Sequence, residues 1–311
     1  MRAAFAAVLL AAAIAGAGYL VWQRADRGPG SSTVMPLQEG AALDAGRAVP
    51  TRSLPVVESR ERVRSAQADH RPSVALASTG FAARLARLEH AADRDDMAAA
   101  AELGALLALC RDFAPMSAED VEASIVTGLA ADEPPPAIGG KPASAEFLIL
   151  LLQQAYAELD RQCAGSENLI DDARAQASLA WLQRAAEAGE IAAMTPYARQ
   201  VLVEQAGEPG DATAVARRVR ALAYLDRAIG AGDAQALLLR SDLHSQGIAV
   251  PADAVAAYAD LHAFARTDVG RQWPPRLVEL YLHALEQPLD AARLAEARRR
   301  GDALWQACCA H

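Results

Sequence analysis

The residues that could form a covalent or metal-bound site are four cysteines and six histidines. Cys110 and Cys163 are isolated in the sequence, whereas Cys308 and Cys309 are adjacent and are followed by His311. Four cysteines allow three complete pairings. Cys110 and Cys163 each lie in phase with the apolar face of an expected helix, so we predict a Cys110–Cys163 disulfide. Two buried free thiols are the alternative, because cysteine is among the most buried residue types.

The cluster of Cys308, Cys309 and His311 does not match a structural metal site. Zinc sites use ligand pairs separated by two to four residues, together with a second pair elsewhere in the chain. Adjacent cysteines lack this spacing. We therefore expect a labile vicinal pair or reactive thiols at this position, and we expect neither a metal nor a cofactor.

The remaining polar residues give no signature of catalysis. The histidines show no His-x-x-x-His spacing, and the chain contains neither a Gly-x-Ser-x-Gly motif nor a phosphate-binding Gly-x-x-x-x-Gly-Lys-Ser/Thr loop. His244, His262 and His283 fit surface or groove positions on helices. The acidic pairs Asp95-Asp96 and Asp171-Asp172 fall at expected helix starts, where carboxylates complement the helix dipole. We predict no catalytic residue and no enzyme activity.

The elements that position these residues follow a repeat. Its two good copies are 43 residues apart, and a weaker copy lies 94 residues upstream of the first. Trp181, Ala185, Gly189 and Ala193 of the first copy match Tyr224, Ala228, Gly232 and Ala236 of the second. In the weak copy, Leu88, Ala91, Asp95 and Ala99 take the places of Leu182, Ala185, Gly189 and Ala193. Self-similarity at such a period indicates an array of helical hairpins.

Each copy fits two short helices joined by a tight turn. Gly189 and Gly232 would provide the left-handed residue that ends the first helix. The alanines stand where the two helices cross, so the backbones could approach closely. Trp181 and Tyr224 would then fill the wedge between one hairpin and the next.

The second copy continues as Gly247-Ile-Ala-Val250-Pro251-Ala-Asp253 and, with this loop, resembles the Sel-one-like repeat, a relative of the tetratricopeptide repeat. That family combines an aromatic-bearing helix, an Ala-Ala-x-x-Gly turn, a small residue four positions on, and a Gly-x-x-Val-Pro-x-Asp loop. The resemblance is clear over 177–266 and faint over 81–110. It implies an α-helical solenoid that contacts other proteins, often as an adaptor, with no chemistry of its own.

Four positions depart from the family pattern. Arg240, Ser241 and His244 stand where the family usually has Leu, Gly and an aromatic residue, and Asp95 stands where a Gly is expected. These departures put the repeat register in doubt outside the clear copies.

The composition favours an all-α fold. Apolar residues make up 52% of the chain but aromatic residues only 5%, which suits Ala- and Leu-rich helices better than strands. We predict a Sel-one-like hairpin solenoid over 81–311, with about ten helices and no sheet. Within it, the apolar stretch 143–162 is expected to be the buried central helix of the N-terminal half. The last helix, 289–307, is expected to cap the array.

The N-terminal segment 1–22 is expected to be a signal anchor. Residues 3–22 are uncharged and mostly apolar, which is long enough for a membrane-spanning helix. Tyr19 and Trp22 would lie at the membrane interface, so we favour an anchor over a signal peptide cleaved after Ala15-Gly-Ala17. Residues 23–80, rich in Pro, Gly and Ser, are predicted to be a disordered linker.

Both interpretations of the N-terminal segment export the rest of the chain. We expect a single-pass protein of the bacterial inner membrane with its body in the periplasm, or a soluble periplasmic protein if the segment is cleaved. An oxidising compartment also favours the disulfide prediction.

The charge distribution excludes nucleic acid as a partner. The chain carries a net charge of −9, and residues 1–71 contain nine Arg and six acidic residues, so the rest of the chain carries −12. An acidic body repels phosphate backbones. We predict an interaction module that binds an unidentified protein or peptide of the cell envelope on the concave face of the solenoid. A shallow groove lined by residues such as Tyr224, Tyr258 and Leu261 would favour this interpretation. A cell-envelope hydrolase with a site hidden from the sequence is the alternative.

Overall fold

The computed structural model describes residues 74–114, 117, 119–120, 123, 137–138, 141–204 and 212–310 of the chain. The expected membrane anchor and most of the expected linker lie outside the described residues. Within these ranges no helix combines the length and the hydropathy needed to cross a bilayer.

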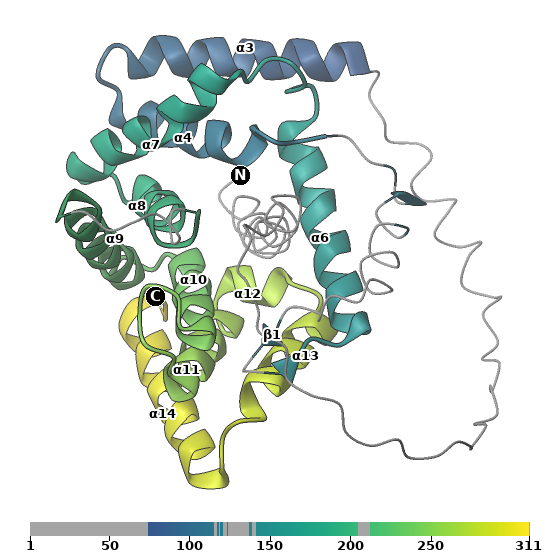
Figure 1. The fold of residues 1–311 in the computed structure, drawn as a ribbon, viewed down its shortest axis with the longest axis vertical. Coiled ribbons are helices and arrows are strands. Elements are labelled where there is room, and N and C mark those ends of the chain that lie inside the picture. The colour runs from purple at the N-terminus through teal and green to yellow at the C-terminus, as the bar shows by residue number, and fades with distance from the viewer. Residues whose placement is uncertain are drawn as a thin grey trace, which may run out of the picture.

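The described residues are α-helical almost throughout, so the all-α prediction is confirmed (Figure 1). The N-terminal helices are α3 (Val74–Ala92), α4 (Met97–Cys110), α6 (Ala145–Cys163), α7 (Asp172–Glu187) and α8 (Ile191–Arg199), which continues as a π-helical turn, η1 (Gln200–Glu204). The C-terminal helices are α9 (Ala212–Gly230), α10 (Ala234–Gln246), α11 (Ala254–Ala265), α12 (Asp268–Gln272), α13 (Pro275–Glu286) and α14 (Ala291–Cys308).

Two features differ from the expected boundaries. Helix α3 begins at Val74, within the stretch that the sequence assigned to the linker. Strands β1 (Ala137–Ile138) and β2 (Lys141–Pro142) form a short antiparallel ladder, which the prediction of no sheet did not include.

The same turn joins the helices of three hairpins, α3–α4, α7–α8 and α9–α10. In each, a residue two or three positions beyond the end of the first helix has a left-handed backbone, with φ of 64° at Asp95, 95° at Gly189 and 85° at Gly232. The next amide donates back to a carbonyl of the first helix: Asp96 N to Ala91 O at 3.2 Å, Glu190 N to Ala185 O at 2.9 Å, and Asp233 N to Ala228 O at 3.0 Å. This hydrogen bond is characteristic of the Schellman motif. The repeat read from the sequence is therefore present three times in the fold.

Asp95 forms this turn without the freedom of a glycine. Aspartate is one of the few residues with a side chain that adopts the left-handed region at modest cost. Its carboxylate also forms an ion pair with Arg184 of the neighbouring hairpin. The weak copy of the repeat therefore keeps the geometry of the two good copies with a different residue.

Small residues set the distances between hairpins. Gly104 lies inside α4, where an added Cβ would come within 2.7 Å of the Leu182 side chain and 2.9 Å of the Ser178 carbonyl oxygen on α7. Gly301 has the same role in α14, where a Cβ would lie 2.7 Å from the Ala259 carbonyl oxygen on α11. Both helix pairs pack so closely that only glycine fits at the crossing.

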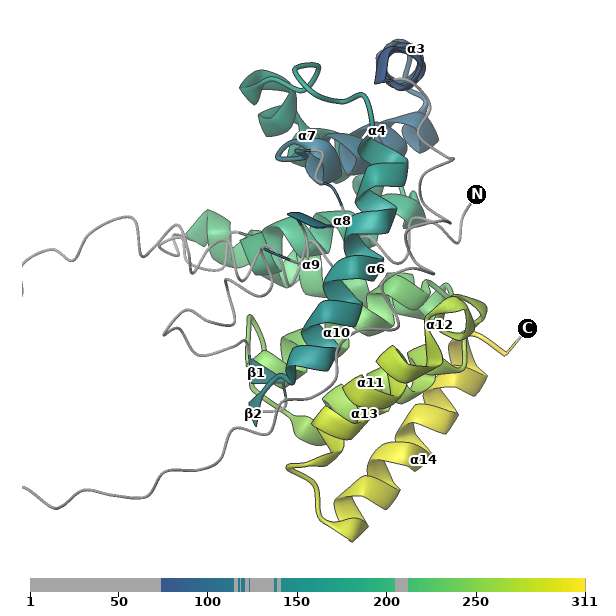
Figure 2. The same cartoon turned by 90° about the vertical axis from the view of Figure 1, so that its right-hand side faces the viewer.

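Helix α6 lies beside the array and joins its two ends (Figures 1 and 2). At the end of α6, Cys163 is bonded to Cys110 of α4. At its start, Glu146 accepts two hydrogen bonds from Arg276 of α13, at 2.9 and 3.1 Å. Next to this pair, the Phe147 ring meets the Tyr281 ring edge-on at 5.4 Å. The prediction of a central helix confined to the N-terminal half is therefore wrong, because α6 packs against both halves.

The C-terminal helices fold back on the array. Trp273 is buried against Phe264 at the break between α12 and α13, with ring centroids 5.1 Å apart. Helix α14 then runs back along α11 (Figure 2). Its end reaches the α9–α10 turn, where the Cys308 carbonyl oxygen lies 3.0 Å from the position of a Cβ on Gly232.

Candidate interaction surface

A shallow hollow lies between the start of α11 and the first half of α14. Its volume is about 470 Å³, and its lining consists of Asp253, Val255, Ala292, Arg293, Glu296 and Arg300. The three charged residues of α14 share one face because they are three, four and seven positions apart. Asp253 lies on the opposite side of the hollow, at the end of the repeat loop that begins at Gly247.

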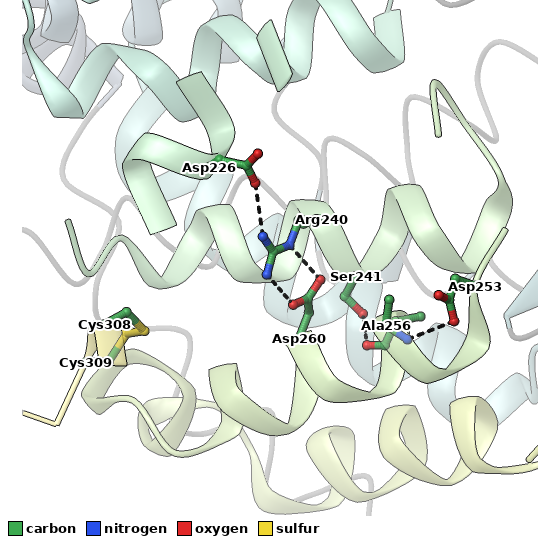
Figure 3. A network of polar contacts seen from close by, with 9 residues as sticks. Asp226, Arg240, Ser241, Asp253, Ala256, Asp260, Cys308 and Cys309 are labelled. Atoms are coloured by element: carbon green, nitrogen blue, oxygen red, sulfur yellow. Dashed lines mark hydrogen bonds and ion pairs between the residues drawn. A yellow bond between two sulfur atoms is a disulfide. The ribbon is translucent and has the colours of Figure 1, made fainter. Parts of the chain in front are cut away.

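The two carboxylates of the hollow are already engaged. Asp253 caps α11 by accepting hydrogen bonds from the amides of Val255 at 2.9 Å and Ala256 at 3.1 Å (Figure 3). Glu296 accepts from Arg300 at 2.7 Å and also from Arg299. These hydrogen bonds hold the pKa of Glu296 below its ordinary value. Each carboxylate of the hollow therefore already has hydrogen-bond donors within the protein, Asp253 through one oxygen and Glu296 through both.

Arg240 ties three consecutive helices together (Figure 3). Its guanidinium donates to both oxygens of Asp260 on α11, at 2.9 and 2.7 Å, and to Asp226 on α9 at 3.1 Å. Burial raises the pKa of Asp260, and the hydrogen bonds from Arg240 oppose that rise. Arg240, which departs from the Sel-one-like pattern, therefore links α10 to α9 and α11.

Ser241, a second departure from the family pattern, also links neighbouring helices. Its hydroxyl donates to the Ala257 carbonyl oxygen at 2.8 Å, and the side chain is fully buried between α10 and α11 (Figure 3). A small side chain is needed here for close packing, and serine satisfies its own hydroxyl within the interface. The polar departures Arg240 and Ser241 thus hold adjacent helices together and do not form a binding site.

The carboxylates with raised pKa values lie in the core. Burial raises the pKa of Asp242 to about 6, where it accepts a hydrogen bond from the Tyr281 hydroxyl. Burial also raises the pKa of Asp233, which accepts from the Thr195 hydroxyl at 2.6 Å. These groups join α10 to α8 and α13, and neither lines the hollow. Within the described ranges, the perturbed acids therefore do not converge on an open pocket, as a general acid–base site would require.

The groove expected from the sequence is not the one found. Tyr258 and Leu261 are 3% and 1% exposed, because α10, α13 and α14 all pack against α11. Arg298 of α14 donates to the Tyr258 hydroxyl at 3.3 Å. Tyr224 is half-buried and meets Tyr197 edge-on at 5.6 Å. Two of the three predicted groove residues are thus core residues, and the hollow lies at the edge of the same helix pair.

The α11–α14 contact carries a row of polar pairs. His262 lies 3.0 Å from Asp302, and Arg266 of α11 stacks over the Trp305 ring at 4.0 Å. His262 and Arg266 both hold the pKa of Asp302 below its ordinary value, His262 more strongly. These pairs fix α14 against α11 and so define one wall of the hollow.

The predicted repeat residues occupy structural positions. The four alanines of the two good copies, Ala185, Ala193, Ala228 and Ala236, are fully buried at the helix crossings. Trp181 is half-buried under the Arg184 guanidinium at 5.2 Å. Gly247 ends α10 with φ of 67°, and Pro251 is exposed in the loop that leads to Asp253. These residues shape the array, and Asp253 is the one that also reaches the hollow.

The four cysteines form two disulfides. Cys110 and Cys163 are bonded with their Cα atoms 5.4 Å apart, and both are buried. This is the predicted pair. Cys308 is bonded to Cys309 at the end of α14 (Figure 3). His311 lies outside the described residues, and among those described no group of three His, Cys, Asp or Glu side chains is placed to hold a metal ion.

The hollow was missed because its residues come from two distant stretches. The sequence predicts only a cap for the last helix, 289–307, and it assigns Asp253 to a loop motif. The usable signal was the spacing of Arg293, Glu296 and Arg300, which places three charges on one face of a helix that also contains a glycine at 301.

Comparison with solved structures gives a structural likeness. No protein-family model and no curated protein matches the sequence. Among solved structures, the chain is similar to a protective antigen present in uropathogenic Escherichia coli strains that displays an SLR, or Sel1-like repeat, fold. The two are 17% identical with a TM-score of 0.38, and the alignment covers 71% of this chain. It spans about half of the antigen, 48% of that chain. The resemblance to the Sel-one-like repeat rests on the recurring turn, the crossing alanines and the Gly247–Asp253 loop.

Proposed function

We propose that this protein is a membrane-tethered, periplasmic helical-repeat module that binds a partner protein or peptide of the bacterial cell envelope, as an adaptor. The observation that carries the proposal is the array of hairpins with three copies of one turn. Stacked hairpins of this kind expose extended surfaces that repeat proteins use for contact. The buried polar groups of the array are used for packing between helices, and the open hollow is lined by exposed charges.

Export is supported by the cysteines. All four are in disulfides, and the Cys110–Cys163 pair is buried in the core. Structural disulfides persist in oxidising compartments and are rare in the cytosol. The tether is supported by the sequence of residues 3–22, which lie outside the described residues. Cleavage after Ala17 would give a soluble periplasmic protein with the same body.

Fractionation of cells that carry the full chain with a C-terminal reporter active only outside the cytoplasm tests the location. We expect reporter activity, together with protein that stays in the membrane pellet after carbonate extraction. A soluble species that begins near Gly18 would instead support signal cleavage. An inactive reporter would refute export altogether.

Crosslinking in intact cells tests the interaction. A photoreactive benzoylphenylalanine at each of several exposed positions of the array, such as Ala223 on α9 and Ala292 on α14, should give discrete adducts with a partner protein. Unfolding the array should abolish them. Absence of any adduct from every position would refute the interaction module. Activity of the purified protein on cell-wall material would support the hydrolase alternative.

A further inference from the structure

The hollow between α11 and α14 has unused hydrogen-bond donors, and each of its two carboxylates already has partners within the protein. Asp253 is engaged by two backbone amides, and Glu296 is held by two arginines. Arg293 is exposed, and within the part of the chain that the structure describes, its guanidinium has no hydrogen-bond or ion-pair partner. Arg300 donates to Glu296 through Nε. An arginine carries five N–H donors, so most of the donors of both side chains remain available.

A carboxylate is the group that matches these donors. Guanidinium and carboxylate form paired, charge-assisted hydrogen bonds that are about twice as strong as neutral ones. Arg293 and Arg300 are seven positions apart on α14, so they lie two turns apart on one face. Between them, Glu296 is already neutralised. The face therefore presents two guanidinium groups about 10 Å apart along the helix, from the 1.5 Å rise per residue. Arg300 is paired with Glu296 through Nε, and Arg293 is unpaired among the described residues.

The hollow also offers a small apolar surface and limited room. Val255 and Ala292 contribute apolar side chains to its lining. A volume of about 470 Å³ falls within the range of about 300–1,000 Å³ typical of ligand sites. Because the hollow is shallow, it can receive a few side chains of a segment that lies across it.

The charge of the body favours this site for an acidic segment. Residues 72–311 carry a net −12 within a chain of −9, so most of the surface repels a carboxylate-rich partner. Complementary charge steers encounter and suppresses wrong partners. The arginine run from 298 to 300 extends the positive surface beyond the hollow.

We propose that this hollow binds an acidic peptide segment of the partner, with carboxylates paired to Arg293 and Arg300 and an apolar side chain against Val255 and Ala292. The inference rests on the proposed function as an interaction module. It adds the location of the contact and the chemistry of the bound segment.

Site-specific crosslinking of the full chain in cells tests this inference. Benzoylphenylalanine at Ala292 should form an adduct whose partner peptide, identified by mass spectrometry, is rich in Asp or Glu. Arg293→Glu should reduce the adduct yield at least tenfold, because it replaces attraction by repulsion. The matched control is Arg94→Glu, since Arg94 is also an exposed arginine without an ion pair in the described structure but lies on the α3–α4 turn. It should change the yield less than twofold.

A charge exchange completes the test. An Asp or Glu of the crosslinked segment changed to Arg should lower the yield with the original chain and restore it with Arg293→Glu. An unchanged yield in Arg293→Glu, a crosslinked segment without acidic residues, or an adduct with a second copy of this chain would each overturn the inference. Adducts from Ala223 with none from Ala292 would refute the hollow while leaving the interaction module in place. Equal melting temperatures of the two arginine variants exclude unfolding as the cause.

Discussion

Asp242 should make the stability of this protein fall as the pH rises through the weakly acidic range. Its side chain is buried in α10, where one oxygen accepts a hydrogen bond from Tyr281 of α13. Desolvation disfavours the charged form, and burial raises the pKa of the carboxyl from an ordinary value of 3.8 to about 6. The hydrogen bond from Tyr281 and the charge of Arg199 oppose this rise and do not cancel it.

The sign and size of the effect follow from linkage. Because the native state holds the proton more tightly than the unfolded chain, the contribution of Asp242 is fully present below about pH 3.8 and is lost as the pH rises through about 6. One pKa unit is worth about 1.4 kcal/mol, so the full loss is about 3 kcal/mol. This is a large part of a typical domain stability of about 5–15 kcal/mol.

Asp242→Asn removes the titrating group but keeps an oxygen for Tyr281. Urea unfolding of the variant and the original protein should be measured between pH 4 and 7.5. We expect the difference in unfolding free energy to shift in favour of the variant by about 2 kcal/mol across this window, because part of the full effect lies below pH 4. The buried amide nitrogen of Asn costs the same at each pH, so it changes the offset between the two curves and not their slopes.

Tyr281→Phe provides a second measurement, because it should increase the pH dependence of stability that Asp242→Asn removes. Removing the hydroxyl removes a hydrogen bond that lowers the pKa of Asp242. The native pKa should therefore be higher in this variant, and the decline in stability should extend to higher pH than in the original protein. The Phe ring retains the edge-on packing with Phe147. Parallel stability curves for the original protein and Asp242→Asn would refute the assignment of the pH dependence to this carboxylate.

Two further predictions concern the covalent and ionic links of the array. Cys110→Ser should lower the unfolding free energy by about 4 kcal/mol, the chain-entropy value for the loop of 53 residues that the bridge closes. Thermal melts of the variant and of the original protein, before and after reduction, measure the loss. Equal melting temperatures of the original protein before and after reduction would contradict the prediction. Arg240→Ala should cost about 3–5 kcal/mol, because it leaves the buried Asp260 carboxylate without its partner. Asp260→Asn in the Arg240→Ala background should recover part of that loss, and no recovery would show that packing rather than charge is responsible.

The hairpin turns could be predicted from the sequence because each is set by a few consecutive residues. The glycine at 189 or 232 adopts the left-handed conformation, and the amide that follows it closes the motif locally. Even Asp95 could be placed by its register with Gly189, although its ion pair with Arg184 could not. That pair joins residues 89 positions apart, and no local pattern specifies it.

Helix α6 shows where sequence reasoning stops. Phe147, Leu151 and Ala155 recur at four-residue spacing in the apolar stretch, and all three are buried, as the spacing predicts. A stripe states which side of a helix is buried and does not state what covers it. Its partner at the start of α6 is α13, whose Arg276 is 130 residues from Glu146. The position of α6 beside the whole array is therefore a property of tertiary packing.

The burial of Tyr258 and Leu261 is also a result of tertiary packing, and the same packing explains where the hollow forms. A repeat pattern treats each hairpin as equivalent, and it leaves the face of α11 open because the resemblance ends at residue 266. In the structure α14 returns along that face, and Gly301 permits the close approach. Helix α14 thus contacts Tyr258 of the expected groove. At the start of α11 it also forms the hollow, where Asp253 lies opposite Arg293 and Arg300. Residues that recognise a partner can thus lie on the helix that caps a repeat array, outside the repeat itself.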